Sequence, residues 1–222
     1  MHALTDYIRY YDNALPTEFC RQLVAGFEQM SGSQLVNGKG VRPGLESSRW
    51  TELNMSRYAD SAMKEFFYKL IDQYLQRYNA DVGLGLPIPL SDRTADLVMK
   101  RYSASQDDGF QPHFDSMYDK ANRYMVFLWY LNDVAEGGET RFTDLNIDVQ
   151  ARCGRLLVFP PYWMYQHAGM PPKSNDKYIL STYLLFDSHT EKNAVERGPG
   201  ACLPRRGQSA ALAHAMDKSA LK

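Results

Sequence analysis

The sequence predicts an α+β fold in which a layer of helices packs against a closed or double β-sheet. Three observations predict it. The chain has 222 residues, the size of one domain. Its apolar residues recur at helical spacing before Ala95 and change to strand-like runs after it. Aromatic residues make up 13% of the chain, led by 15 Tyr, and this favours a protein with many strands.

The first part of the chain carries two helical patterns. Apolar residues recur at helical spacing from Phe19 to Phe27. A second helix begins after Asp60 or Ser61, either of which can cap it. Its apolar stripe consists of Met63, Phe67, Leu70, Ile71, Tyr74, Leu75 and Tyr78. Between the helices, residues 31–48 are rich in Gly and Ser and predict a long loop, either a plain surface loop or a lid.

The second part of the chain carries the predicted strands. They are the runs DLVMKRYS, RYMVFLWYL, GRLLVF and KYILSTYLLF, which are short, β-branched or aromatic, and separated by turn-forming clusters such as SQDDG and PPKSND. Several runs are apolar on both faces, as in a sandwich or barrel whose strands are covered on each side.

Composition excludes several classes of protein. The formal net charge is −1, so there is no electrostatic reason to expect a nucleic acid or an anionic membrane as a partner. The three cysteines are far apart without C-x-x-C spacing, so neither a disulfide framework nor a zinc-thiolate site is indicated. The longest apolar run, Met125–Leu131, is far shorter than the ~20 residues of a membrane helix. With no signal-like segment at the start, we expect a cytoplasmic protein without a membrane partner.

Three side chains of the second part could hold a metal ion. His113 and Asp115 form an H-x-D pair, and on a strand side chains two apart point to the same side. The pair alone is weak, since a histidine hydrogen-bonded to a neighbouring aspartate looks the same. His167 follows a buried strand, and two histidines with one carboxylate are the ligand set of non-haem Fe(II) oxygenases.

Lys177 is the fourth candidate, ten residues after His167 at the start of the last strand. The inward-facing positions of that strand are predicted to be Lys177, Ile179, Ser181, Tyr183 and Leu185. A buried ammonium group needs an anionic partner. The distal carboxylate of a dicarboxylic cosubstrate would supply one and could accept a hydrogen bond from Ser181. The alternative is a solvated lysine in a loop.

These residues belong to a longer series with a specific order and spacing. Its members are the strand ending at Tyr102, the pair His113 and Asp115, YLN at 130–132, EGGET at 136–140, the strand at 154–159, His167-Ala168-Gly169 and Lys177. From about residue 97 to residue 186 the chain thereby resembles the Fe(II)/2-oxoglutarate dioxygenases, and more closely their prolyl 4-hydroxylase-like branch.

The resemblance implies a double-stranded β-helix (jelly roll) with N-terminal supporting helices. Residues 1–222 would form a single dioxygenase domain, with helical support and loops at 1–94, a jelly-roll core at 95–187 and a C-terminal extension at 188–222. It also implies that His113, Asp115 and His167 hold Fe(II). Lys177, Tyr102, Tyr130 and Ser181 would bind 2-oxoglutarate, and no catalytic group is expected beyond the metal centre.

The implied reaction converts 2-oxoglutarate and O₂ to succinate and CO₂ while the substrate is hydroxylated, with ascorbate as a possible reductant. The expected substrate is a prolyl residue in a peptide or protein. The alternatives are a free amino acid or other small metabolite, or a non-catalytic jelly-roll binding module. The aromatic candidates for substrate contact, which could equally be core residues, are Tyr118, Trp129, Tyr183 and Trp163. Tyr183 stands where the family often has Trp.

Overall fold

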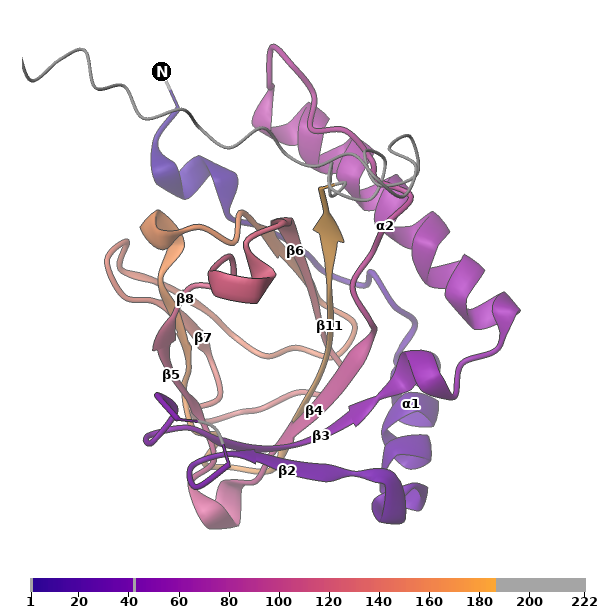
Figure 1. Ribbon diagram of the computed structural model, residues 1–222, viewed down its shortest axis with the longest axis vertical. Coiled ribbons are helices and arrows are strands. Elements are labelled where there is room, and N and C mark those ends of the chain that lie inside the picture. The colour runs from indigo at the N-terminus through magenta and orange to yellow at the C-terminus, as the bar shows by residue number, and fades with distance from the viewer. Residues whose placement is uncertain (1, 42, 187–222) are drawn as a thin grey trace, which may run out of the picture. The chain divides into compact units, whose positions relative to one another are not determined.

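The computed structural model describes residues 2–41 and 43–186. Two antiparallel β-sheets form the centre of the fold (Figure 1). In sheet order, the seven strands of the larger sheet are β1 (Arg9–Tyr11), β9 (Leu156–Phe159), β6 (Arg123–Tyr130), β11 (Lys177–Leu185), β4 (Val98–Tyr102), β3 (Arg49–Asn54) and β2 (Leu35–Gly38). Those of the smaller sheet are β5 (Phe110–His113), β10 (His167–Gly169), β7 (Thr140–Phe142) and β8 (Ile147–Val149). This arrangement confirms the predicted α+β fold with a double-stranded β-helix.

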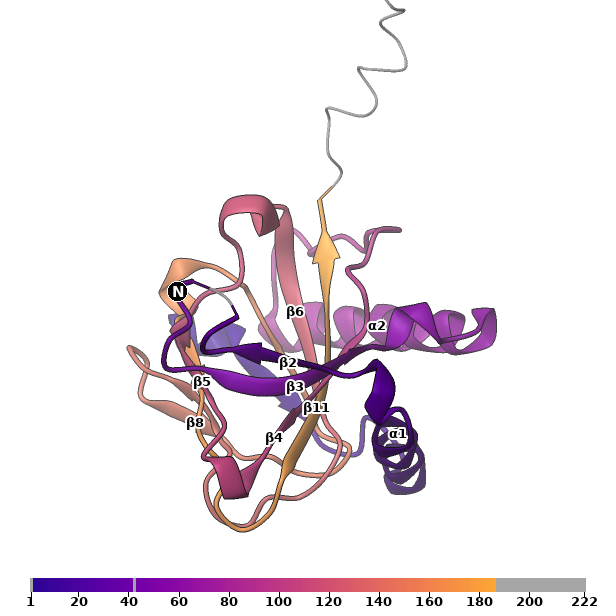
Figure 2. The ribbon, with the colours of Figure 1, turned by 60° about the horizontal axis from the view of Figure 1, so that its bottom comes forward.

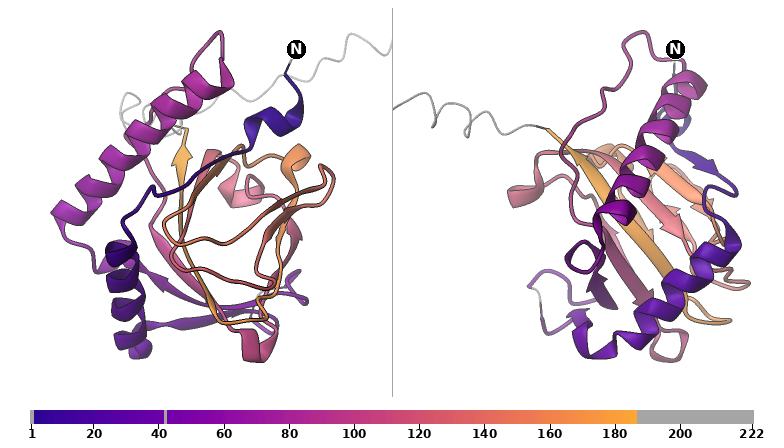
Figure 3. Two further views of the ribbon diagram at one scale, coloured as in Figure 1. Left: turned by 180° about the vertical axis from the view of Figure 1, so that it is seen from behind. Right: turned by 90° about the vertical axis from the view of Figure 1, so that its right-hand side faces the viewer.

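Two α-helices pack on the outer face of the larger sheet (Figure 3). They are α1 (Thr17–Gln29) and α2 (Ser61–Val82), and both were predicted from the sequence. Asp60 caps α2, since its Oδ1 accepts a hydrogen bond of 2.8 Å from the backbone N–H of Met63. Short 3₁₀ helices span Leu4–Tyr7, Ser31–Ser33, Met55–Arg57, Ala104–Gln106, Tyr118–Lys120 and Trp163–Tyr165. Within the described residues, no helix combines the length and apolar composition of a membrane span.

The larger sheet separates two apolar clusters. One fills the space between this sheet and the helices, and the other lies on its inner face and includes side chains of the smaller sheet such as Phe142. Alternation along β6 sends Phe127 and Trp129 to the first cluster and Val126 and Leu128 to the second. Trp129 is therefore a core residue whose ring centroid lies 5.4 Å from that of Phe67. This corrects the expectation that it contacts substrate.

The four predicted strand runs are all present, as β4, β6, β9 and β11, but the front of the chain also contributes strands to the larger sheet. The strands β1, β2 and β3 precede residue 95, and Figure 2 shows β2 and β3 running alongside β4. Because β2 occupies Leu35–Gly38, the loop expected at 31–48 is shorter than predicted. The proposed division at residues 94 and 187 remains a prediction, and the extension at 188–222 lies outside the described residues.

Replacing Gly154 with Ala is expected to destabilise the fold. Gly154 has φ +77°, and a Cβ there would meet the backbone oxygen of Leu15. A non-glycine residue in the left-handed region costs about 1–3 kcal/mol. In a domain of this size, Tm falls by roughly 2–4 °C for each kcal/mol. Thermal unfolding followed by circular dichroism measures the change. The matched control is Gly26→Ala, since Gly26 lies in α1 with open space around it, and an unchanged Tm for Gly154→Ala would contradict the expectation.

Candidate metal centre

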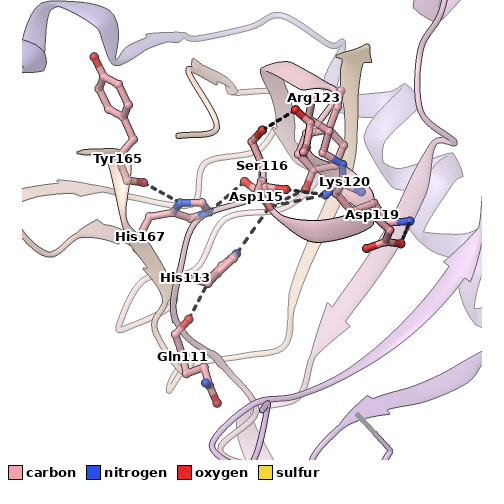
Figure 4. A network of polar contacts seen from close by, with 11 residues as sticks. Gln111, His113, Asp115, Ser116, Asp119, Lys120, Arg123, Tyr165 and His167 are labelled. Atoms are coloured by element: carbon pink, nitrogen blue, oxygen red, sulfur yellow. Dashed lines mark hydrogen bonds and ion pairs between the residues drawn. The ribbon is translucent and has the colours of Figure 1, made fainter. Parts of the chain in front are cut away.

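The two candidate histidines come from neighbouring strands of the smaller sheet. β5 and β10 are antiparallel, and His113 lies directly opposite His167 in their register. After β5 the chain turns, and the backbone N–H groups of Asp115 and Ser116 both donate to the oxygen of Pro161 at 3.0 Å. This turn directs the Asp115 carboxylate toward both imidazoles (Figure 4). One potential ligand atom from each of the three side chains lies within 4.8 Å of the other two.

Hydrogen bonds to the backbone fix the tautomer of each imidazole. Nδ1 of His113 lies 2.9 Å from the oxygen of Gln111, and Nδ1 of His167 lies 3.1 Å from that of Tyr165. A carbonyl oxygen only accepts, so Nδ1 carries the proton and donates it. Each Nε2 therefore has a free lone pair facing Asp115, at 3.7 Å from Oδ1 for His113 and 3.6 Å from Oδ2 for His167.

The charge states suit a divalent cation. Burial, with a smaller contribution from the neighbouring His167, lowers the pKa of His113 to about 3, and burial also lowers the pKa of His167. Burial would raise the pKa of Asp115. This effect of burial is outweighed by the opposite effects of the two histidines, of Arg123 and of a hydrogen bond from Tyr183. Together they hold the pKa of Asp115 below its usual value. Two neutral imidazoles thus face one carboxylate.

A metal ion would resolve an unsatisfied contact at this centre. Oδ2 of Asp115 is buried and has no hydrogen-bond partner among the described residues. Lone pairs on the two Nε2 atoms and on the Asp115 carboxylate face one another, an arrangement that is unfavourable without a cation between them. Two imidazoles and one carboxylate are the facial ligand set of non-haem Fe(II) sites, so the residues present fit that ion.

The candidate metal ligands His113, Asp115 and His167 line a cavity of about 730 Å³ between the sheets. All five residues predicted to face inward from the last strand line this cavity, namely Lys177, Ile179, Ser181, Tyr183 and Leu185. Side chains alternate between the two faces of a strand, so Lys177 and Ser181 lie on the same face of β11. This alternation is how the sequence predicted which side chains of β11 point inward. Lys177 and the candidate ligands thus line the same cavity.

Lys177 is a buried lysine with no acidic partner among the residues that the structure describes. Its side chain is only 2% exposed, and within the described part of the chain no carboxylate forms an ion pair with it. Its Nζ lies 5.3 Å from the ring centroid of Tyr102 and 5.6 Å from that of Tyr130. Burial lowers the pKa of Lys177 to about 7, although Glu139 opposes the shift. An anionic ligand in the cavity would complete this site.

Of the three other residues predicted to bind the cosubstrate, two line the cavity and one lies behind its wall. Tyr102 and Ser181 both line the cavity. Tyr130 is fully buried, and its hydroxyl donates to Oγ1 of Thr140 at 2.7 Å. Thr140 itself lines the cavity, so it stands between Tyr130 and the cavity space. Sequence reasoning missed Thr140, although its place at the end of EGGET was a usable signal.

The predicted substrate contacts do not gather in one place. Tyr118 is 87% exposed and Trp163 is 65% exposed, each on a 3₁₀ turn, and neither lines the cavity. Tyr183 does line it, and its hydroxyl donates to Oδ1 of Asp115 at 2.9 Å. Arg123, which also lines the cavity, was missed, because nothing in its sequence surroundings distinguishes it from a surface arginine.

Comparison with protein families supports the same chemistry. Residues 97–185 match the model of the 2OG-Fe(II) oxygenase superfamily. A protein of Acanthamoeba polyphaga mimivirus named "Putative prolyl 4-hydroxylase" is 30% identical over 111 residues, 41% of this chain and 45% of that protein. The match thus spans less than half of the relative's length. These findings confirm the resemblance predicted from the sequence.

Solved structures show the same fold. A prolyl hydroxylase of Trichoplax adhaerens, in complex with a hypoxia inducible factor peptide fragment, has a TM-score of 0.63 at 16% identity, covering 87% of this chain and 89% of that one. A prolyl-4-hydroxylase of Pseudomonas putida has a TM-score of 0.56 at 20% identity, covering 82% and 94%. A viral collagen prolyl hydroxylase of Paramecium Bursaria Chlorella virus-1, as its 2OG complex, has a TM-score of 0.55 at 19% identity, covering 80% and 94%.

Proposed function

We propose that this chain, whose residues 97–185 match the model of the 2OG-Fe(II) oxygenase superfamily, is an Fe(II)- and 2-oxoglutarate-dependent hydroxylase that acts on a prolyl residue of a peptide or protein. The observation that carries the proposal is the convergence of His113, Asp115 and His167 in the same cavity as Lys177, a buried lysine that no carboxylate of residues 2–41 and 43–186 pairs with. When bound, iron and 2-oxoglutarate supply the oxidation of a C–H bond by O₂, with succinate and CO₂ as co-products.

The chain's own residues have distinct roles in this proposal. The two imidazoles and the Asp115 carboxylate hold Fe(II). Lys177 pairs with the distal carboxylate of 2-oxoglutarate, and the hydroxyls of Tyr102 and Ser181, in the same cavity, are available to donate to it. Apolar side chains that line the cavity, Val126, Leu128 and Ile179, exclude water from the space between anchor and metal.

A peptide substrate is supported by the relatives. All three structures described above are prolyl hydroxylases, and one of them holds a peptide fragment. Turns with the exposed side chains Tyr118 and Trp163 flank the segment that carries Asp115, and such side chains suit contact with a chain that extends beyond the cavity.

A small zwitterionic metabolite is the second candidate, and one observation favours it. The cavity is lined by charged side chains of both signs, among them Asp96, Asp119, Arg57, Lys120 and Arg123. An amino acid carries an ammonium and a carboxylate group, and each could meet an opposite charge there.

One experiment tests the reaction class and the substrate in sequence. Fe(II) and 2-oxoglutarate are added to the purified protein without oxygen, and the visible charge-transfer band of the ternary complex is recorded. Oxygen is then admitted and succinate is measured. Peptides containing proline and a pool of amino acids are each scored by mass spectrometry for the gain of one oxygen. A band without succinate, or neither signal, would refute the proposed reaction, whereas oxygen gain only in amino acids would favour the metabolite.

The affinity for 2-oxoglutarate is expected to fall as the pH rises above about 7. In the free protein, burial lowers the pKa of Lys177 to about 7. The bound carboxylate favours the charged amine and raises the pKa of Lys177. Binding of 2-oxoglutarate is therefore coupled to proton uptake at pH values between the pKa of Lys177 in the free protein and its pKa in the complex. Affinity is therefore greatest below the free-state pKa and falls by up to about tenfold per pH unit above it.

Calorimetric titration of the Mn(II)-loaded protein at several pH values, without oxygen, measures this slope. A Lys177→Met variant is the control and should bind 2-oxoglutarate with little pH dependence over the same interval. A flat profile for the native protein would show that the lysine is not the titrating anchor.

A further inference from the structure

Tyr183 makes a direct contact with one of the candidate ligands. It lies on β11 and faces the cavity, and its hydroxyl donates to Oδ1 of Asp115 at 2.9 Å. A carboxylate oxygen only accepts, so the Tyr183 hydroxyl is the donor in this hydrogen bond.

This contact makes the two carboxylate oxygens of Asp115 unequal. Oδ1 accepts the Tyr183 hydrogen bond, whereas Oδ2 is buried without a hydrogen-bond partner in the described part of the chain. Each oxygen also lies near one imidazole, Oδ2 at 3.6 Å from Nε2 of His167 and Oδ1 at 3.7 Å from Nε2 of His113, so the hydrogen bond is what distinguishes the two oxygens. A free carboxylate can turn about its terminal torsion, which is broad and roughly two-fold, and present either oxygen. The hydroxyl removes this freedom.

Arg123 holds the tyrosine ring in place. The central carbon of its guanidinium lies over the Tyr183 ring at 3.7 Å from the ring centroid, a cation–π contact. Its NH1 nitrogen lies 4.0 Å from Oδ1 of Asp115 and 3.5 Å from the backbone oxygen of the same residue. The ring is thus fixed by the same arginine that lies beside the carboxylate, on β6 next to β11.

We propose that Tyr183 is a positioning residue whose hydroxyl engages Asp115 Oδ1 and thereby presents Oδ2 alone to the metal ion. The inference rests on the proposed function, because it requires a metal ion held by Asp115 and the two histidines. Groups that orient a metal ligand typically change metal affinity when removed, and they do so without touching the ion. The role differs from the substrate contact expected for Tyr183 from the sequence.

The test is the affinity of the metal-free protein for Mn(II), followed by electron paramagnetic resonance of the unbound ion. Tyr183→Phe keeps the ring beneath Arg123 and removes only the hydroxyl. Its dissociation constant for Mn(II) is expected to rise by roughly 10- to 100-fold. The matched control is Tyr78→Phe, which removes the hydroxyl of another buried tyrosine, one that donates to the backbone oxygen of Tyr7 at 2.8 Å. That variant should bind Mn(II) like the native protein.

The outcomes separate the inference from the proposed function. A native protein that fails to bind Mn(II) would overturn both. Native binding with an unchanged Tyr183→Phe variant, or with Tyr78→Phe weakened equally, would overturn only the role of Tyr183. A crystal structure of the Mn(II)-loaded native protein is a second readout that needs no variant. Coordination through Oδ2, with the tyrosine hydroxyl on Oδ1, supports the inference, and coordination through Oδ1 or through both oxygens contradicts it.

Discussion

His167→Ala is expected to abolish metal binding and, with it, succinate formation. The variant leaves one imidazole and one carboxylate, and two ligands make a poor site. Loss of a group that only orients a ligand costs roughly 10- to 100-fold in affinity, so loss of a ligand itself should exceed about 100-fold. Mn(II) titration and succinate production from 2-oxoglutarate measure the two effects.

The matched control is His2→Ala, because His2 is exposed and its ring contacts only that of Tyr7 among the described aromatic contacts. Metal-free thermal unfolding of both variants shows whether the fold survives, since His167 is buried against Phe142 and Phe159. A folded His167→Ala protein that binds Mn(II) as tightly as the native one would contradict the assignment of this ligand.

Lys177→Met is expected to weaken 2-oxoglutarate binding about 100-fold or more while leaving the metal site intact. Methionine matches the length of the lysine stem and lacks its charge. Removing one partner of a buried charge pair costs about 3–5 kcal/mol, and each 1.4 kcal/mol is about tenfold in affinity. Calorimetry with 2-oxoglutarate on the Mn(II)-loaded protein measures the loss, and Mn(II) affinity itself should not change.

Lys173→Met provides the control, because Lys173 is exposed on the turn that leads to β11. In the absence of ligand, Lys177→Met should be at least as stable as the native protein, since an uncompensated buried charge is replaced by an apolar side chain. Equal 2-oxoglutarate affinity in the two variants would mean that the distal carboxylate binds elsewhere.

The sequence predicted which side chains of β11 point to the inner face of the sheet, but it did not predict this for β6. The reason is physical. Along β11 the expected pairing of Lys177 with an anionic ligand set the inward face, and alternation places Ser181 on the same face. The run that became β6 is apolar at almost every position, because both faces of that strand are covered. Its pattern does not show which side chains point to the inner face of the sheet. Trp129 was therefore assigned to the wrong face of the sheet.

Contacts between distant segments account for most of what the sequence did not reveal. The strands β1 and β2 have three and four residues, too few for a periodic signal, and their partners are distant or set by a turn. The bond from Tyr183 to Asp115 joins residues 68 apart and depends on the turn that follows β5. The metal candidates were predictable because His113 and Asp115 are close in sequence and His167 ends a readable strand.

The pairing of His113 with His167 has a consequence for the smaller sheet. β5 is the edge strand of that sheet, and in the described part of the chain β10 is its only partner. An edge strand has a neighbouring strand on one side only, and segments with few contacts open most readily. An ion bound by both imidazoles would act as a cross-link between the last residue of β5 and the first residue of β10. The metal would then protect this edge from fraying, in addition to any part it takes in the reaction.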